Sequence, residues 1–199
     1  MSVMNRVREM KKTYEEAGNS LEENWAISRE CYLFINKILE SGKTILEFGS
    51  GIGTEILNQN HNMISIEEDS SFIGRHPSLY IYAPLKKLDD KLLEKYSPSS
   101  SWYDPEIIDK ELNGKQPKKY DLILVDGPAY GGGRGGFYEY LHLFDTSLPI
   151  VFDDIEREDD KRIFDMVVEK LGRPIKVVEG RTNTKTGIIL TKELEHLKD

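Results

Sequence analysis

Three aspartates follow two of the most apolar stretches of the chain, where they could bind a metal ion or act as a general base. Asp126 ends the run Tyr-Asp-Leu-Ile-Leu-Val-Asp, and Asp153 and Asp154 end Pro-Ile-Val-Phe-Asp-Asp. Short apolar runs are typical of parallel strands, whose carboxyl ends meet at one edge of a sheet. Clustered carboxylates there suit a hard divalent cation such as Mg²⁺. In a simpler alternative, Asp126 alone is a general base and Asp153 caps the next helix.

A glycine-rich segment with one arginine lies between these aspartates. Residues 129–137 read Ala-Tyr-Gly-Gly-Gly-Arg-Gly-Gly-Phe, with Arg134 near the middle. Glycines allow a segment to move, and a guanidinium pairs well with carboxylates and phosphates. We therefore expect this segment to close over a substrate and Arg134 to bind an anionic group on it. A plain surface loop is the alternative.

A second glycine pattern lies earlier, in the stretch Thr-Ile-Leu-Glu-Phe-Gly-Ser-Gly-Ile-Gly-Thr over residues 44–54. Glycines after a strand let a ligand approach the backbone closely. A P-loop would need a lysine after Gly53, and none is there. The dinucleotide pattern GxGxxG would need a glycine where Thr54 stands. The loop therefore predicts a ligand held without a phosphate clamp.

An acidic residue follows the second apolar run at the expected place. Glu67 comes directly after residues 63–66 and 20 residues after Glu47. A carboxylate at such a strand end can accept hydrogen bonds from both ribose hydroxyls. The adjacent Glu68 and Asp69 are expected to be solvated or to cap a helix.

The elements that must position these residues alternate between strands and helices. We expect an α/β domain whose sheet is covered by helices on both faces. The predicted strands are residues 44–48, 63–66, 79–82, 120–125, 149–152, 175–178 and 187–191. The predicted helices are 21–40, a helix after Gly53, and stretches near 85–96, across 134–145 and across 156–171. The last two strands are joined by a short polar loop, so we expect them to be antiparallel.

Residues 97–119 form a long connection before the fourth predicted strand. Connections of this length are usually functional or mobile. Trp102 and Tyr103 within it are expected either to cover a pocket or to anchor the connection to the core.

Composition limits the classes of partner. The chain has 199 residues, a formal net charge of −8 and a single cysteine, Cys31. The negative charge disfavours nucleic acid, and one cysteine excludes an internal disulfide and any CxxC motif. No apolar run is long enough to span a membrane, and residues 1–12 lack a signal-peptide core. We therefore expect a cytoplasmic protein.

The spacing Glu47-x-Gly49-x-Gly51-x-Gly53, Glu67 and the terminal hairpin together resemble the class I S-adenosylmethionine-dependent methyltransferases. The resemblance covers about residues 40–192. It implies a Rossmann-like, doubly wound, mostly parallel seven-stranded sheet with an antiparallel last strand. It also implies one methyltransferase domain over 1–199, with a helical cap over 1–42 and the core over 43–192. The implied S-adenosylmethionine-binding residues are Glu47, Gly49, Ser50, Gly51, Gly53, Glu67 and Asp126.

The resemblance extends to the aspartates, with one departure elsewhere. Metal-dependent O-methyltransferases of the catechol type usually carry Asn where this chain has Asp154, so Asp126, Asp153 and Asp154 are the implied metal ligands. Many relatives place an acidic residue after the third strand to hold adenine, but this chain has Ala-Pro-Leu at 83–85. The adenine-binding residues are therefore unassigned.

The implied reaction is O-methylation of a small hydroxylated or saccharide-type acceptor, since the Asp-Gly-Pro and Asp-Asp-x-x-Arg forms look closer to glycan-pathway relatives. Asp126, Asp153 and Arg134 are the candidate catalytic residues. Two alternatives stay open, namely an adenosyl-binding module without turnover and an NAD-dependent oxidoreductase. The N-terminal helix could cover the cofactor or form a homodimer surface.

Overall fold

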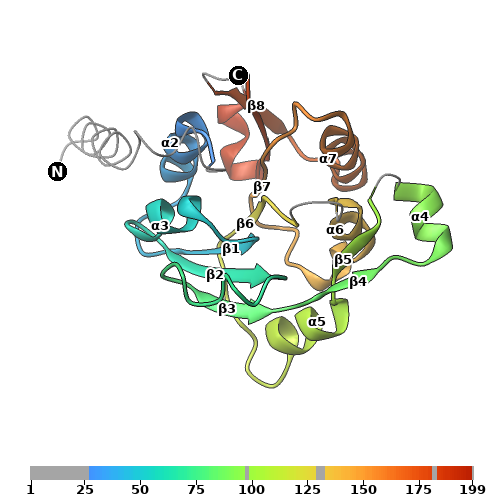
Figure 1. The fold of residues 1–199 in the computed structure, drawn as a ribbon. Coiled ribbons are helices and arrows are strands. Elements are labelled where there is room, and N and C mark those ends of the chain that lie inside the picture. The colour runs from blue at the N-terminus through green and yellow to red at the C-terminus, as the bar shows by residue number, and fades with distance from the viewer. Residues whose placement is uncertain (1–26, 97–98, 129–132, 181–182, 199) are drawn as a thin grey trace.

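The computed structural model describes residues 27–96, 99–128, 133–180 and 183–198 (Figure 1). Its main sheet has seven strands in the order β3-β2-β1-β6-β7-β9-β8. The strands are β1 (Thr44–Phe48), β2 (Asn62–Glu67), β3 (Leu79–Tyr82), β6 (Leu122–Val125), β7 (Ile150–Phe152), β8 (Ile175–Glu179) and β9 (Lys185–Ile189). Only β9 runs against its neighbours, β7 and β8. The predicted fold class and antiparallel last strand are therefore confirmed, with strand boundaries within two residues of those expected.

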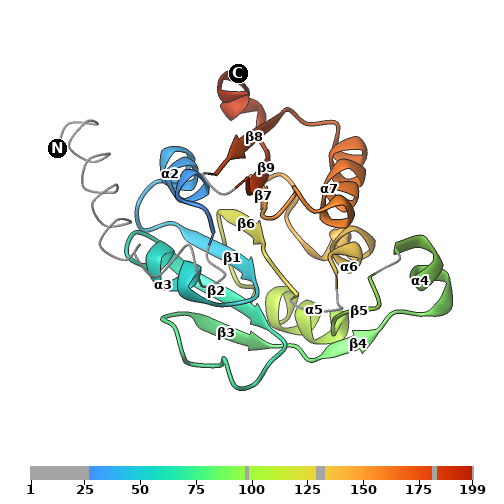
Figure 2. The same cartoon turned by 45° about the horizontal axis from the view of Figure 1, so that its top comes forward.

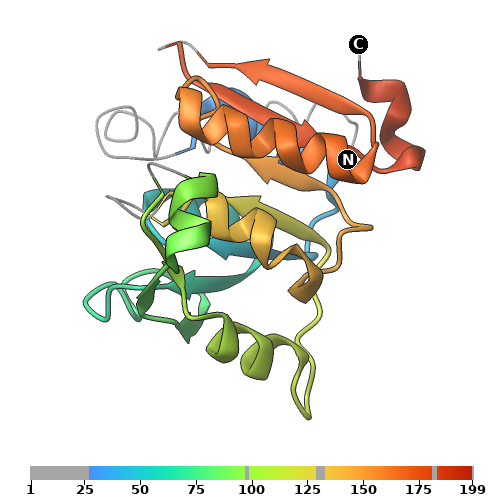
Figure 3. The ribbon, with the colours of Figure 1, turned by 90° about the vertical axis from the view of Figure 1, so that its right-hand side faces the viewer.

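Helices cover both faces of the sheet. They are α2 (Arg29–Ile38), α3 (Ile52–Asn58), α4 (Asp90–Tyr96), α5 (Pro105–Asn113), α6 (Gly135–Glu139) and α7 (Glu158–Leu171). Side chains alternate across β1, so that Ile45 packs with α2 and α3 while Leu46 packs with α5, α6 and α7. Figures 2 and 3 show these two layers, with α5, α6 and α7 together on one side of the sheet. Burial on both faces explains why the strands read as continuous apolar runs.

The chain order creates a natural place for a ligand. From β1 the chain moves outward through β2 and β3, and then returns to pair β6 with the other edge of β1. Ligands of open α/β sheets bind outside the carboxyl ends of the strands at such a reversal. The glycine loop after β1 and Asp126 after β6 both lie at this point.

The connection over 97–119 is more structured than expected. Within it, β5 (Ser101–Tyr103) pairs with β4 (Leu85–Lys87) in a separate two-stranded sheet, and α5 follows. Asp104 caps α5 and Pro105 is its first residue, a start signal that was readable in the sequence. Trp102 and Tyr103 are 1% and 0% exposed, so they anchor this segment to the core. Residues 97 and 98 lie outside the described part.

Three predicted helices need correction. The one near 85–96 begins as strand β4, and α4 starts only at Asp90. The one across 134–145 is the short α6 followed by a 3-10 turn at Leu141–Leu143. The one over 21–40 is α2, capped by the Ser28 hydroxyl, and residues 21–26 lie outside the described part.

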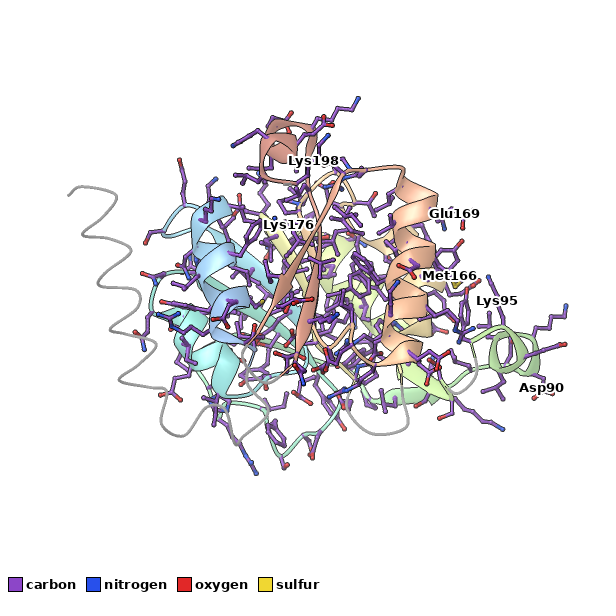
Figure 4. The ribbon with its side chains drawn as sticks, turned by 90° about the horizontal axis from the view of Figure 1, so that it is seen from above. Asp90, Lys95, Met166, Glu169, Lys176 and Lys198 are labelled. Carbon is purple, nitrogen blue, oxygen red and sulfur yellow. The ribbon has the colours of Figure 1, made fainter. Side chains whose placement is uncertain are left out.

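The outer surface is charged where the helices face solvent. In Figure 4 the labelled side chains of Asp90 and Lys95 on α4, and of Glu169 on α7, extend from the edge of the molecule. In the part of the chain that the structure describes, no helix is both long enough and apolar enough to cross a membrane.

Candidate functional site

The glycine loop turns tightly from β1 into α3. Gly49 has a φ of +84°, a backbone conformation that favours glycine, and its N–H donates to the Ile66 carbonyl at 2.8 Å. Gly51 precedes the first residue of α3, and its N–H donates to Thr54 Oγ1 at 2.9 Å. Thr54, which stands where the dinucleotide pattern would have its third glycine, therefore closes the loop through this hydrogen bond.

Glu67 ties this loop to the end of β2. Its Oε2 accepts from the Ser50 N–H at 2.8 Å and the Ser50 hydroxyl at 3.0 Å. Its Oε1 accepts from the N–H groups of Glu68 and Asp69, at 2.9 and 3.0 Å. Four donors thus meet one carboxylate that is 4% exposed. The loop and the acidic strand end form one polar unit, which we call the loop–Glu67 cradle.

Glu47 lies beneath the cradle, buried within the sheet. It is 3% exposed, and its Oε1 accepts a short hydrogen bond from the Ser65 hydroxyl on β2. Burial, with a smaller contribution from the charge of Glu67, raises the pKa of Glu47 to about 8. Glu47 is therefore mostly protonated at neutral pH, and its hydrogen bond with Ser65 links β1 to β2.

Gly127 allows β6 to end close to the glycine loop. A Cβ added there would collide with the Tyr103 hydroxyl and would lie 2.9 Å from the Phe48 carbonyl and 3.0 Å from the Gly49 nitrogen. Two of these three obstacles are backbone atoms, which cannot rotate away. The approach of β6 to β1 at this point therefore requires glycine.

Gly127→Ala is expected to lower the free energy of unfolding by about 1–3 kcal/mol through overpacking. Gly51→Ala is the matched control, because an added Cβ there meets nothing within 4 Å and its φ of −169° suits any residue. The control should cost about 1 kcal/mol or less, the difference between glycine and alanine at a helix start. Urea denaturation compares the two, and equal destabilisation would contradict the packing argument.

The predicted aspartates do come together, around Arg134. The Arg134 guanidinium lies 3.6 Å from Asp126 Oδ1, 3.3 Å from Asp154 Oδ2 and 3.5 Å from Asp160 Oδ2. It also donates to the main-chain carbonyls of Asp126 and Asp153. The Arg134 side chain is only 3% exposed. Arg134 is thus an internal cation of the cluster, and the expectation that it binds an anionic group of a substrate does not fit this placement.

Asp126 and Asp153 differ in their exposure to solvent. The side chain of Asp126 is 32% exposed, whereas Asp153 is buried and accepts from the Thr186 hydroxyl at 2.7 Å. Burial and the charge of Asp154 raise the pKa of Asp153 to about 6, against the opposing effect of Thr186 and Arg134. Burial and the charge of Asp153 likewise raise the pKa of Asp126. Asp126 is the carboxylate that an incoming molecule can contact.

The predicted metal set and the predicted cap both need correction. Among the described residues, no group of three or more His, Cys, Asp or Glu side chains could hold a metal ion. The physical reason is that the Arg134 guanidinium lies against Asp126 and Asp154, where a cation would need their oxygens. Asp153 does not cap α7 either, because that helix follows Arg157 and no side chain caps it.

Sequence reasoning missed two residues of this region, Asp160 and Thr186. Only Asp160 left a usable signal, because it stands three residues after Arg157 on the first turn of α7, where such pairs meet. Thr186 lies on β9, distant in sequence from Asp153, to which it donates a hydrogen bond.

Comparisons with known proteins are limited to general likeness. No protein-family model matches the chain, and no curated protein matches it. A Pyrococcus furiosus methyltransferase structure is 17% identical with a TM-score of 0.48, over 80% of each chain. A Silicibacter pomeroyi methyltransferase-like protein is 17% identical with a TM-score of 0.45, over 80% of this chain and 86% of that one. Aeropyrum pernix fibrillarin with bound S-adenosyl-L-methionine is 14% identical with a TM-score of 0.43, over 76% of this chain and 67% of that one. No residue role follows from these values.

Proposed function

We propose that this chain binds S-adenosylmethionine and methylates an oxygen of a small hydroxylated or saccharide-type acceptor. The observation that carries the proposal is the loop–Glu67 cradle, which joins Gly49–Gly53 to a strand-end carboxylate through Ser50. Ribose hydroxyls are donors that can compete with the Ser50 hydroxyl for Glu67 Oε2. The residues of the cradle therefore fit an adenosyl group.

The same cradle disfavours a phosphate. A carboxylate on the floor of the loop repels an anion, and no lysine follows Gly53 to offset it. Thr54 closes the loop by accepting from the Gly51 N–H, so this donor is not free for a pyrophosphate. These features favour an adenosyl cofactor without phosphate over NAD.

The aspartate cluster supports the acceptor chemistry. When bound, S-adenosylmethionine supplies an already activated methyl group, so positioning an oxygen in line accounts for much of the rate. Asp126 is accessible and follows β6, next to the glycine loop, where it can accept the proton of an acceptor hydroxyl. Burial and then the neighbouring carboxylate of Asp153 raise the pKa of Asp126 and so make it a better base.

Calorimetry with S-adenosylmethionine, S-adenosylhomocysteine and NAD tests the cofactor assignment. We expect binding of the first two and none of NAD. Binding of NAD alone would overturn the proposal. A screen of small hydroxylated compounds and sugars with methyl-labelled cofactor then tests the acceptor class, and transfer only to nitrogen or to nucleic acid would contradict it.

Gly51→Ala should separate cofactor binding from stability. The added methyl group meets no protein atom within 4 Å, so it projects into the space over the loop. We expect S-adenosylhomocysteine to bind about 10- to 100-fold more weakly, the effect of an overpacked contact of 1–3 kcal/mol. Calorimetry gives the affinity and thermal unfolding gives the stability. Unchanged affinity would place the adenosyl group away from Gly51.

Acceptor methylation is expected to be unchanged by EDTA, because Arg134 already provides the cation that the aspartates need. The measurement is the initial rate with the acceptor found in the screen, with and without EDTA and then with added Mg²⁺. Loss of activity in EDTA and its return with Mg²⁺ would show that the cluster rearranges to hold a metal.

A further inference from the structure

The glycine loop is joined to the sheet by two separate hydrogen-bonded links. In the first, the Ser50 N–H and hydroxyl donate to Glu67 Oε2 at 2.8 and 3.0 Å. In the second, the Gly51 N–H donates to Thr54 Oγ1 at 2.9 Å. The Thr54 hydroxyl also hydrogen-bonds to the Glu47 carboxyl, where it opposes the rise in pKa that burial causes. Neighbouring residues of the loop are therefore connected to two different glutamates.

The second link continues into the sheet. A hydroxyl can accept and donate at the same time, so Thr54 can bond to the Gly51 N–H and to Glu47 together. The Glu47 carboxyl accepts a further hydrogen bond from the Ser65 hydroxyl on β2. Thr54, Glu47 and Ser65 are 2%, 3% and 0% exposed. The link therefore runs from the loop through α3 and β1 to β2, and all of its side chains are buried.

The two links differ in their response to a bound cofactor. The ribose hydroxyls of the proposed cofactor donate to Glu67, so they compete with Ser50 for Oε2. The first link is then weakened in the state in which the loop must hold the ligand. The side chains of the second link are buried, so a ligand over the loop does not compete for them. In the complex, the position of the loop therefore depends on Thr54.

We propose that Thr54 is a positioning residue that holds the glycine loop in place when the ribose binds the Glu67 carboxylate. Its hydroxyl acts through the Gly51 N–H and does not itself contact the cofactor. A glycine at this position, as in the dinucleotide pattern, would have no side chain with which to form the link. This inference rests on the proposed function.

Thr54→Val is the direct test, because valine has nearly the same shape and lacks the hydroxyl. The free variant keeps the link between Ser50 and Glu67, whereas its complex would lose both links. Calorimetry should therefore show S-adenosylhomocysteine binding about 10- to 100-fold more weakly, the value of one or two hydrogen bonds. Thr54→Ser restores the hydroxyl and should bind within about threefold of wild type. Thermal unfolding checks that each variant is folded at the temperature of the titration.

Ser50→Ala separates the two links. It removes the hydroxyl that competes with ribose, so the affinity for S-adenosylhomocysteine should equal or exceed that of wild type. Without ligand, Ser50→Ala and Thr54→Val combined should lower the unfolding temperature by more than the sum of the single effects, because either link can hold the loop alone. If the Thr54 hydroxyl served stability only, Thr54→Val would unfold earlier but keep its affinity, and the two effects would add.

Hydrogen exchange on the wild-type protein provides a measurement that does not depend on whether any variant folds. The Gly51 amide should exchange slowly in the free protein and stay protected with saturating S-adenosylhomocysteine, because its hydrogen bond to Thr54 persists. Faster exchange of this amide in the complex would mean that the link breaks on binding, and it would overturn the proposal.

Ser99→Ala is the matched control for Thr54→Val. Ser99 is 5% exposed, and its hydroxyl also accepts from a glycine N–H, that of Gly135 at 3.3 Å. Its affinity for S-adenosylhomocysteine should equal that of wild type. An equal loss of affinity in Ser99→Ala, or a Thr54→Val affinity within about threefold of wild type, would overturn the positioning role and leave the proposed function intact. Wild-type protein that does not bind S-adenosylhomocysteine would overturn both.

Discussion

Arg134→Met is expected to destabilise the protein by about 3–5 kcal/mol at pH 8, the usual cost of leaving buried charges without their partner. The guanidinium is 3% exposed and lies within 3.6 Å of carboxylate oxygens of Asp126, Asp154 and Asp160. Methionine fills much of the same volume, so the loss reflects charge and hydrogen bonding more than a cavity. Urea denaturation measures the free energy of unfolding.

The destabilisation should shrink as the pH falls. Asp153 has its pKa raised by burial and by Asp154 to about 6, above the usual value of 3.8, so the folded state binds more protons than the unfolded state between these values. Stability then falls as pH rises through this window. The charge of Arg134 lowers the pKa of both Asp126 and Asp153, so removing it should raise these two pKa values further and extend the window upward. At pH 5 Asp126 and Asp153 of the variant carry less negative charge than at pH 8, so the difference from wild type should be smaller.

Arg157→Met is the control for Arg134→Met. Arg157 also pairs with Asp154, at 2.9 Å, but its side chain is 55% exposed. Solvent screens such a pair, and its removal should cost less than about 1 kcal/mol. Equal effects of the two substitutions, or an effect of Arg134→Met that does not change with pH, would contradict the role of Arg134 as an internal cation.

Glu67→Gln is expected to weaken S-adenosylhomocysteine binding by about 100-fold. The two oxygens of Glu67 accept from two pairs of donors, at Ser50 on one side and at Glu68 and Asp69 on the other. A glutamine has one oxygen, so its NH₂ group must face one donor pair. In the proposed complex the ribose hydroxyls donate to this carboxylate. Each hydrogen bond to a charged acceptor is worth about 1.5–3 kcal/mol, so the loss of two from the ribose corresponds to at least 100-fold in affinity.

Asp69→Asn provides the comparison for Glu67→Gln. Asp69 is exposed and accepts from the Ser71 N–H at 2.8 Å, which an asparagine oxygen can still do. Its affinity for S-adenosylhomocysteine should equal that of wild type in calorimetry. Affinity of Glu67→Gln within about threefold of wild type, a difference below 1 kcal/mol, would remove Glu67 from the adenosyl site.

Much of the fold was predictable because its signals are local. Apolar runs such as Leu122–Val125 report burial on both faces, and the glycines at 49, 51 and 53 report a tight turn between a strand and a helix. The final hairpin was readable from its short polar connection. The pairing of β4 with β5 was not readable, because strands of three residues are too short for a periodic pattern and α4 lies between them in the chain.

The features of the candidate site likewise divide into those that the sequence predicted and those that only the structure showed. The sequence by itself determined that Asp126 and Asp153 end neighbouring strands and that Glu67 ends β2, since parallel strands bring their carboxyl ends to one edge. Only the tertiary structure decided that Arg134 is buried among the aspartates and that the Tyr103 hydroxyl reaches Gly127. A sequence pattern reports whether a side chain is buried, but the charges and hydroxyls that it meets there come from segments far along the chain. Their identity depends on how the helices and the β4–β5 sheet pack against the main sheet.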